Sequence, residues 1–252
     1  MIRVAVSGIG GHMGRLVAGT VAAQDDLELV AGLDPHHAGE TIGGIVVASD
    51  PIVIGEADVV VEFTNPDVVM ENLDRWRDLG VHAVVGTSGF DEARLADLRG
   101  RWGSSGPKCL VVPNFSIGAV LMMRFAEIAA PHFAASEIIE LHHDRKADAP
   151  SGTALATADR MQGGPQRRQV ESAELVAGSR GADAEGVRVH SVRLPGLLAH
   201  QEVLLGSPGE TLTIRHDTSD RISFIPGVLL GVRSVARLED PLTVGLEGLL
   251  GI

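Results

Sequence analysis

The chain has 252 residues, of which 33 are acidic and 21 are Lys or Arg, and its formal net charge at pH 7 is −12. This charge repels a phosphate backbone, and an aromatic share of 3% without any Tyr disfavours the stacking platforms that bind single-stranded nucleic acid. We therefore expect no nucleic-acid partner. The length is sufficient for two modest domains, each with its own core.

The cysteine content and the apolar runs indicate a compartment. A single cysteine, Cys109, excludes an internal disulfide and is typical of a reducing environment. The residues after Met1 form a strand pattern rather than the charged segment and longer apolar stretch of a signal peptide. Every apolar run is shorter than the roughly 20 residues of a membrane span. These features predict a cytoplasmic protein that does not bind membranes.

The first motif is a glycine-rich loop between a strand pattern at 2–7 and a helical pattern at 15–24. Glycines at 8, 11 and 14 suit a tight turn, a close approach of the backbone to a pyrophosphate, and close helix packing. The N-terminus of the helix attracts the phosphates. The residues that we predict to bind a dinucleotide are Gly8, Ile9, Gly10, Gly11, His12 and Met13.

A second strand pattern, at 27–33, ends in Asp34, about twenty residues after Gly14. A carboxylate at this place accepts hydrogen bonds from a ribose 2′-hydroxyl and repels a 2′-phosphate. The residues that follow, Pro35-His36-His37, include no Arg that would compensate. We expect NADH or NADPH as the cofactor, with NADH preferred or with dual use.

Strand and helix patterns alternate from residue 2 to about residue 113. After the first two strands come strand patterns at 58–63, 81–85 and 108–112 and helical patterns at 68–79 and 91–102. This alternation predicts a doubly wound parallel sheet in an α/β, Rossmann-like dinucleotide-binding domain. A helical pattern at 224–238 is expected to pack on the same domain, which we place at residues 1–113 plus 222–252.

The pattern changes after Ser116, so we place a smaller α+β domain at residues 114–221. We expect it to bind substrate. A long helical pattern near 121–130 comes first, and strand patterns that suggest a mixed sheet follow at 187–194, 200–205 and 211–216. The polar stretch 162–186 predicts a loop or a short helix without chemistry.

Residues 140–154 concentrate the titratable side chains. His142 and His143 end a strand pattern, and Lys146 follows in the next loop. Ser151 or Thr153 is expected to cap a helix at 154–161, and such a helix start beside a lysine attracts a carboxylate or phosphate. We favour proton transfer or substrate binding over a metal site, because the spacing of metal ligands is absent. A Ser151 nucleophile is disfavoured because the Gly-x-Ser-x-Gly context is missing.

Together these motifs resemble the dihydrodipicolinate reductase family along nearly the whole chain, most specifically at residues 142–154. The glycine loop supports the resemblance, as do Glu62-Phe63-Thr64, Gly86-Thr87-Ser88-Gly89, Asn114-Phe115-Ser116, His200, Gly209-Glu210, His216 and Arg221. Two positions depart from the family's pattern. His12 stands where a basic residue is frequent, and Ser88 stands where Thr is more usual.

The resemblance implies NAD(P)H-dependent reduction of 4-hydroxy-tetrahydrodipicolinate, a small cyclic dicarboxylate, to tetrahydrodipicolinate in lysine and diaminopimelate biosynthesis. It makes His142 the proton donor and Lys146 a second donor or an electrostatic stabiliser. It places substrate binding at His143, Ser151, Gly152 and Thr153, and nicotinamide binding at Gly86, Thr87, Ser88, Val112, Pro113, Asn114 and Phe115. It also implies a homotetramer formed through the second domain, and we expect hinges near Asn114 and Arg221.

Two other functions remain as alternatives. Another two-domain NAD(P)-dependent oxidoreductase, acting on a sugar or hydroxy acid, requires a Lys-Pro type donor set that residues 140–154 do not provide. A non-enzymatic dinucleotide sensor requires a DNA-binding element or a partner surface. The acidic balance of the chain disfavours the sensor.

Overall fold

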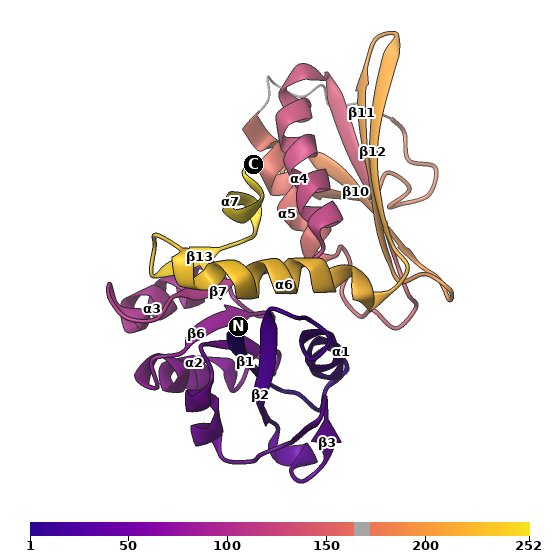
Figure 1. Cartoon of the computed structure of the whole chain (residues 1–252). Helices are drawn as coiled ribbons and strands as arrows, with labels where there is room; N and C mark the ends of the chain where they lie inside the picture. The colour runs from indigo at the N-terminus through magenta and orange to yellow at the C-terminus, as the bar shows by residue number, and fades with distance from the viewer. Residues whose placement is uncertain (164–171) are drawn as a thin grey trace. The chain divides into compact units, whose positions relative to one another are not determined.

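The computed structural model describes residues 1–163 and 172–252 (Figure 1). The chain forms two compact units. Unit 1 comprises Met1–Ser116 and Phe224–Ile252, and unit 2 comprises Ile117–Ser223. Within the described ranges, no helix is long and apolar enough to cross a membrane.

Unit 1 is built on a six-stranded parallel sheet, which confirms the fold class expected for this part of the chain. In spatial order the strands are β13 (Leu242–Val244), β7 (Cys109–Val111), β6 (His82–Val85), β5 (Val59–Glu62), β1 (Ile2–Ser7) and β2 (Leu27–Leu33). The sequence patterns do not predict β13, because three residues are too few to show a periodicity. It pairs with β7 at the edge of the sheet.

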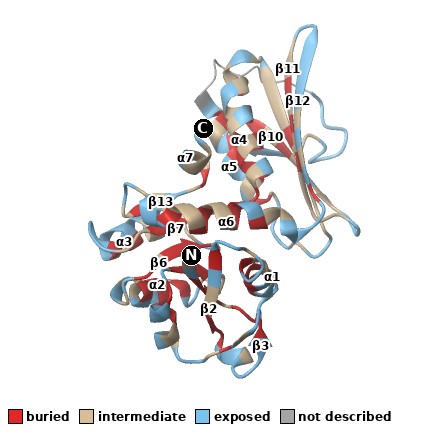
Figure 2. Ribbon diagram, viewed as in Figure 1, coloured by how far each residue is buried: buried red, intermediate tan, exposed pale blue. Residues whose placement is uncertain are grey.

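Helices cover both faces of this sheet. The helices are α1 (His12–Val21) and α6 (Ile225–Ser234) on one face, and α2 (Val69–Asp78) and α3 (Glu92–Trp102) on the other. Along β1, Val4 and Val6 pack in the core with α1 and α6, whereas Ala5 packs in the core with α2 and α3. Continuous apolar strands are expected when a parallel sheet is covered on both faces. Figure 2 shows the resulting buried residues along the central strands.

Smaller elements complete unit 1. They are the strands β3 (Thr41–Ile42) and β4 (Ile45–Val46), the C-terminal helix α7 (Glu247–Leu250), and 3-10 helices at Pro35–His37, Pro51–Glu56 and Val235–Arg237. Helix α1 begins at His12, earlier than the predicted start at residue 15, so the glycine loop leads directly into the helix. Pro226 lies in the first turn of α6, where a proline leaves no necessary hydrogen bond unmade.

Unit 2 contains a five-stranded mixed sheet and two helices, α4 (Ile117–Ala129) and α5 (Gly152–Arg160), which confirms its predicted architecture. In spatial order the strands are β12 (Glu210–Thr218), β11 (Ala199–Ser207), β8 (Ala135–His142), β10 (Val187–Arg193) and β9 (Ala182–Ala184). Among the described strands of this second sheet, only β8 and β10 pair in parallel, and the other pairs are antiparallel.

The prediction of loop or short helix for residues 162–186 is wrong at β9. Its sequence, Ala-Asp-Ala, has low strand propensity, and pairing with β10 determines its conformation. Residues 164–171 of the same stretch lie outside the described residues.

Strand β8 alternates between a buried and a half-buried face. Ile138 and Glu140 are both 0% exposed, whereas Ile139 and Leu141 between them are half-buried. Residues two apart on a strand share a face, so His142 continues the face of Glu140. Because β8 and β10 run parallel, His142 and Arg193 end at the same edge as register partners. The sheet therefore brings together two residues separated by fifty positions in sequence.

Candidate active site

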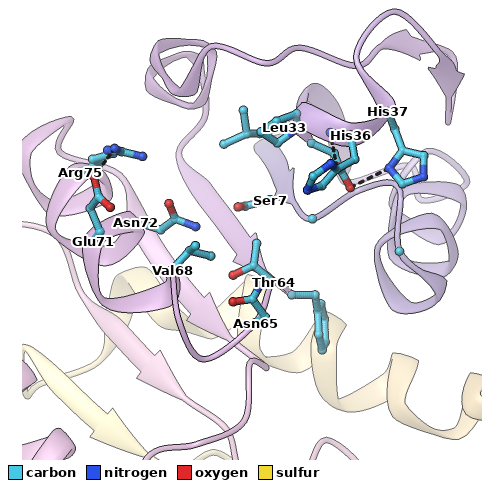
Figure 3. Close-up of a pocket in the computed structure, with 15 residues that line it drawn as sticks. Ser7, Leu33, His36, His37, Thr64, Asn65, Val68, Glu71, Asn72 and Arg75 are labelled. Carbon is cyan, nitrogen blue, oxygen red and sulfur yellow. Dashed lines mark hydrogen bonds and ion pairs between the residues drawn. The ribbon is translucent and has the colours of Figure 1, made fainter.

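A cavity of about 360 Å³ lies in unit 1 at the carboxyl ends of β1, β2 and β5 (Figure 3). This edge of a parallel sheet is where open α/β folds bind ligands. Figure 3 shows His36 and His37 on one side of the cavity and Asn72, Glu71 and Arg75 of α2 on the other. The α2 residues are additions to the predicted set, because no sequence motif marks them.

The glycine loop forms part of the cavity wall. Gly8 has a φ of +78°, and a Cβ there would lie 2.3 Å from the carbonyl oxygen of Phe63. A Cβ on Gly14 would lie 2.1 Å from the carbonyl oxygen of Gly8. Gly11 is the N-cap of α1 and provides no side-chain cap, so the helix start has backbone N–H groups available for an anion. The loop thus fits the pyrophosphate of a dinucleotide.

Asp34 also lines the cavity, and both oxygens of its carboxylate accept hydrogen bonds. One oxygen accepts a hydrogen bond from the N–H of Gly10 at 3.1 Å, and the other accepts one from the N–H of His36 at 3.0 Å. Nδ1 of His37 lies 3.1 Å from the first oxygen. Burial raises the pKa of Asp34, but His37 and the two N–H groups outweigh it and hold the pKa below its ordinary value. The sequence interpretation noted the missing Arg but not this histidine partner.

Glu62 is a carboxylate at the end of β5 that is 0% exposed and contacts residues of the cavity wall. It accepts hydrogen bonds from the Thr64 hydroxyl, from the Asn72 amide at 3.2 Å and from the Trp76 indole at 2.9 Å. Burial raises the pKa of Glu62 above its ordinary value, against these hydrogen bonds. Thr64 and Asn72 line the cavity, and the N–H of Thr64 donates to the hydroxyl of Thr87 at 3.0 Å. Glu62 therefore holds Thr64 and Asn72 in the wall of the cavity.

The residues predicted to contact nicotinamide lie at the carboxyl ends of β6 and β7. A Cβ on Gly86 would lie 2.2 Å from the Phe63 ring and 2.7 Å from the Phe115 ring. Glycine at this position therefore leaves room for the two rings to pack together, with their centroids 5.6 Å apart. Val112 and Phe115 are buried, as is Ile9 of the glycine loop. The side chains of these three residues belong to the core, so they offer main-chain atoms to a ligand.

In unit 2 a second cluster surrounds His142 at the end of β8. Its Nδ1 lies 2.5 Å from the buried carboxylate of Glu140. Arg193 donates two hydrogen bonds to the same carboxylate, at 2.7 and 2.9 Å, and the N–H of Ser151 donates a third at 3.2 Å. Burial raises the pKa of Glu140, but hydrogen bonds from Arg193, Ser191 and His142 outweigh it and lower the pKa overall. The histidine is thus paired with a carboxylate that remains ionised.

Neither Glu140 nor Arg193 belongs to the predicted site. The i, i+2 spacing of Glu140 and His142 on a strand was a usable signal, because alternate residues share a face. Arg193 follows from the register of β10 against β8, and no local motif announces it.

Lys146 and His143 lie beside this cluster. The ammonium of Lys146 contacts both oxygens of Asp148, at 2.8 and 2.7 Å. Nδ1 of His143 is buried and has no hydrogen-bond partner in the part of the chain that the structure describes. A buried polar atom without a partner is rare, and a ligand group is one way to satisfy it.

The N-terminus of α5 completes the cluster. Ser151 is the N-cap, and its hydroxyl accepts a hydrogen bond from the N–H of Ala154 at 3.2 Å. Of the two predicted caps, Ser151 is confirmed, and the helix begins at Gly152 rather than at residue 154. Gly152 and Thr153 occupy the first turn, where backbone N–H groups lack partners within the helix. These N–H groups suit a carboxylate.

Across residues 1–163 and 172–252, no three His, Cys, Asp or Glu side chains are grouped so that they could hold a metal ion. The structure combines three features: a glycine loop that starts a helix, an acidic residue at the end of the second strand, and a titratable cluster on a separate sheet. Together they are typical of one class of protein, the two-unit dinucleotide-dependent oxidoreductases.

Comparisons with known proteins identify the family. Two family models match, dihydrodipicolinate reductase, N-terminus, over residues 2–115, and dihydrodipicolinate reductase, C-terminus, over residues 118–250. The 4-hydroxy-tetrahydrodipicolinate reductase of Nocardia farcinica is 53% identical over 100% of this chain and 99% of that protein. That of Thermobifida fusca is 53% identical over 100% of both. The chain belongs to the dihydrodipicolinate reductase family, as its motifs predicted.

Solved structures agree with this assignment. A dipicolinate-bound dihydrodipicolinate reductase from Paenisporosarcina sp. TG-14 matches with a TM-score of 0.84 and 38% identity, over 98% of this chain and 99% of that one. An apo scyllo-inositol dehydrogenase from Lactobacillus casei matches with a TM-score of 0.63 and 13% identity, over 100% and 93%. The second likeness shows the shared fold alone. The oxidoreductase interpretation is confirmed over the dinucleotide sensor.

Proposed function

We propose that this protein reduces 4-hydroxy-tetrahydrodipicolinate to tetrahydrodipicolinate with NAD(P)H, a step of lysine and diaminopimelate biosynthesis. Family membership over the full chain supports the reaction. A relative with 38% identity is named as binding dipicolinate, a ring with two carboxylates. The observation that carries the proposal is the pairing of His142 with Glu140 on β8, next to Lys146 and the start of α5.

The reaction needs a proton as well as a hydride. When bound, the reduced nicotinamide supplies the hydride. His142 provides the proton, and a positioned acid of this kind typically contributes roughly 10² to 10⁴ in rate. Lys146 acts as a second donor or as an electrostatic stabiliser. His143, Gly152 and Thr153 bind the carboxylates, and Ser151 supports them as the cap of α5.

The dinucleotide binds at residues 8–13 of the glycine loop and at Asp34, and Gly8, Gly11 and Asp34 line the cavity. The close contacts that a Cβ on Gly8, Gly10 or Gly14 would make support this placement. Residues 86–88 and 112–115 contact the nicotinamide. The ionised Asp34 favours NADH or dual use over strict NADPH dependence. Comparison of kcat/KM for NADH and NADPH tests this preference, and a large advantage of NADPH contradicts it.

The family resemblance supports a tetramer, and the cysteine content and the change of pattern after Ser116 support a cytoplasmic location and the hinges. The enzyme is a cytoplasmic homotetramer, assembled through the sheet of unit 2, and it has hinges near Asn114 and Arg221. Sedimentation of the purified chain tests the tetramer. Residues 1–113 with 222–252 act as the dinucleotide-binding domain, and residues 114–221 act as the substrate-binding and oligomerisation domain.

The activity is tested by following NADH absorbance while dihydrodipicolinate synthase generates the substrate. Turnover is expected for the intact chain. The variant His142→Ala is expected to lose about 10²-fold or more in kcat. His190→Ala is the matched control, because His190 is also paired with a glutamate of β8 and is expected to leave turnover unchanged. Normal turnover in His142→Ala contradicts the assigned donor.

Lys146 allows a sharper experiment, because arginine keeps the positive charge but does not release its proton near neutral pH. Lys146→Arg retains most of the activity if the ammonium acts only as a stabiliser. It loses as much as Lys146→Ala if the ammonium gives up a proton. Equal, undiminished kcat in both variants removes Lys146 from the mechanism.

A further inference from the structure

Strand β8 carries two glutamates that each contact one arginine and one histidine. Glu137 accepts hydrogen bonds from Arg180 and from Nε2 of His190, the latter at 2.7 Å, and its side chain is 29% exposed. Glu140 has the same types of partner but is 0% exposed. The two sets differ in burial and in which nitrogen of the histidine they bind. Glu137 can therefore serve as the control for substitutions of Glu140.

Both oxygens of Glu140 are bound. Arg193 reaches Oε1 at 2.7 Å and Oε2 at 2.9 Å, and Nδ1 of His142 lies 2.5 Å from Oε2. A guanidinium that binds in this bidentate way stabilises the ionised carboxylate. An ionised carboxylate can only accept hydrogen bonds, so Nδ1 of His142 carries the hydrogen.

This bond determines which nitrogen of His142 exchanges a proton. With Nδ1 held against Glu140, Nε2 is the nitrogen that can transfer a proton to a substrate. The charged groups that face the ring are Glu140 on its own strand, Arg193 on β10 and Lys146 in the following loop. Burial lowers the pKa of His142, Glu140 opposes this by raising it, and the two cations lower it further.

Arg193 also connects the carboxylate to the loop that carries Lys146. It donates a hydrogen bond to the main-chain carbonyl of Asp148 at 2.6 Å, in addition to its contacts with Glu140. Asp148 in turn contacts the ammonium of Lys146. The carboxylate of Glu140 is therefore the point at which the strand, the loop and the N-terminus of α5 meet, since Ser151 donates to it as well.

We propose that Glu140 is a positioning residue for His142, which fixes the Nδ1–H tautomer and directs Nε2 toward the substrate, and that Arg193 keeps Glu140 ionised for this task. This inference rests on the proposed role of His142 as the proton donor. The proton leaves Nε2 for the electron pair that hydride addition creates on the substrate. The neutral ring retains its Nδ1–H bond to Glu140 and regains the Nε2 proton from water.

The test compares Glu140→Gln with Glu137→Gln in the full-length chain. The amide removes the negative charge while it keeps the shape of the side chain. We expect Glu140→Gln to lower kcat about 10²-fold, within the range of a positioned acid. Loss of the charge also lowers the pKa of His142, so the alkaline limb of the kcat profile moves to lower pH. Glu137→Gln is expected to change neither quantity.

Further measurements distinguish positioning from a structural role. Glu140→Asp, which restores the charge, is expected to return the alkaline limb toward its original pH even where kcat remains reduced. An unmoved limb in a folded Glu140→Gln enzyme overturns the inference. If His142→Ala is inactive in that case, the proposed function stands and only the role of Glu140 is lost. Normal turnover of His142→Ala removes both.

The tautomer itself is measurable if Glu140→Gln does not fold. Nitrogen-15 chemical shifts of histidine in the unmodified enzyme, assigned with His142→Ala, report which ring nitrogen holds the proton above the pKa of the ring. A protonated Nδ1 supports the inference. A protonated Nε2 with a bare Nδ1 overturns it.

Discussion

Each of the two units completely buries a glutamate that lies on a strand, Glu62 on β5 and Glu140 on β8, but the surroundings of the two glutamates differ. Glu62 in unit 1 accepts hydrogen bonds from neutral donors, the Thr64 hydroxyl, the Asn72 amide and the Trp76 indole. Glu140 in unit 2 accepts them from Arg193, from His142 and from one backbone N–H. Two equally buried glutamates therefore differ in their surroundings: Glu62 has only neutral donors, and Glu140 has a cation among its donors.

The difference shows in the direction of the two pKa shifts. Burial raises the pKa of Glu62, and neutral donors do not reverse this. Burial also raises the pKa of Glu140, but its hydrogen bonds lower the pKa by more than burial raises it. The largest of these lowering effects comes from Arg193. A cation beside a buried carboxylate therefore favours its ionised form, whereas neutral donors alone do not offset the effect of burial on the pKa. In unit 1 the buried glutamate holds two residues of the cavity wall, and in unit 2 it holds a histidine.

The largest effect on stability is expected when Glu140 loses its cation. Arg193→Met keeps much of the side-chain volume but leaves a buried carboxylate without its bidentate partner. Breaking a buried ion pair from one side costs about 3 to 5 kcal/mol. The free energy of unfolding in urea should fall by about 3 kcal/mol or more.

The control for this change is Arg180→Met, which removes the arginine of Glu137. Both side chains of that pair are about 30% exposed, so solvent replaces the lost contact. We expect a loss of about 1 kcal/mol or less. Equal losses in the two variants contradict the importance of burial at Glu140. The double variant Glu140→Gln with Arg193→Met should lose less than Arg193→Met alone, because no buried charge remains.

A smaller effect is expected at Glu62 when one neutral donor is removed. Trp76→Phe keeps an aromatic ring in the core but removes the indole N–H that lies 2.9 Å from Glu62. An unsatisfied acceptor of this kind costs roughly 1 to 3 kcal/mol. Trp102→Phe is the matched control, because Trp102 is also buried but donates to the carbonyl of Pro107. A Trp76→Phe loss no larger than that of Trp102→Phe indicates that Glu62 needs no third donor.

The sequence predicted the features that repeat locally. The alternation of strands and helices and the spacing of Gly8, Gly11 and Gly14 are local patterns, and they led to the α/β sheet and its glycine loop. The cluster at 140–154 is also local, and the cap at Ser151 follows from residue type.

Contacts set by sheet register are not visible in such patterns. Arg193 meets Glu140 because β10 pairs in parallel with β8, across fifty residues of chain. Trp76 meets Glu62 because α2 packs on β5. β13 was not predicted because pairing with β7, rather than its three-residue sequence, defines it as a strand. Each of these depends on tertiary structure that periodicity does not encode.

The smallest expected effects are pH-dependent, and they have opposite signs at the two glutamates. An ordinary glutamate titrates near 4.5. Because the folded-state pKa of Glu62 is raised, its contribution to stability falls as pH rises from this value through the folded pKa. Because the folded-state pKa of Glu140 is lowered, its contribution is present above this value and is lost as pH falls through the folded pKa.

The two glutamine variants separate these contributions. Unfolding free energies are measured in urea between about pH 3 and pH 8, the range in which carboxylate linkage acts. The unmodified chain loses stability as pH rises because Glu62 ionises, and Glu62→Gln should not show this loss. The unfolding free energy of Glu62→Gln relative to that of the unmodified chain should therefore increase as pH rises. The unmodified chain loses stability as pH falls because Glu140 becomes protonated, and Glu140→Gln should not show this loss. The amount by which the unfolding free energy of Glu140→Gln lies below that of the unmodified chain should therefore shrink as pH falls. If both variants change with pH in the same direction, the two buried carboxylates do not differ in charge state, and the contrast between the units is only one of hydrogen-bond partners.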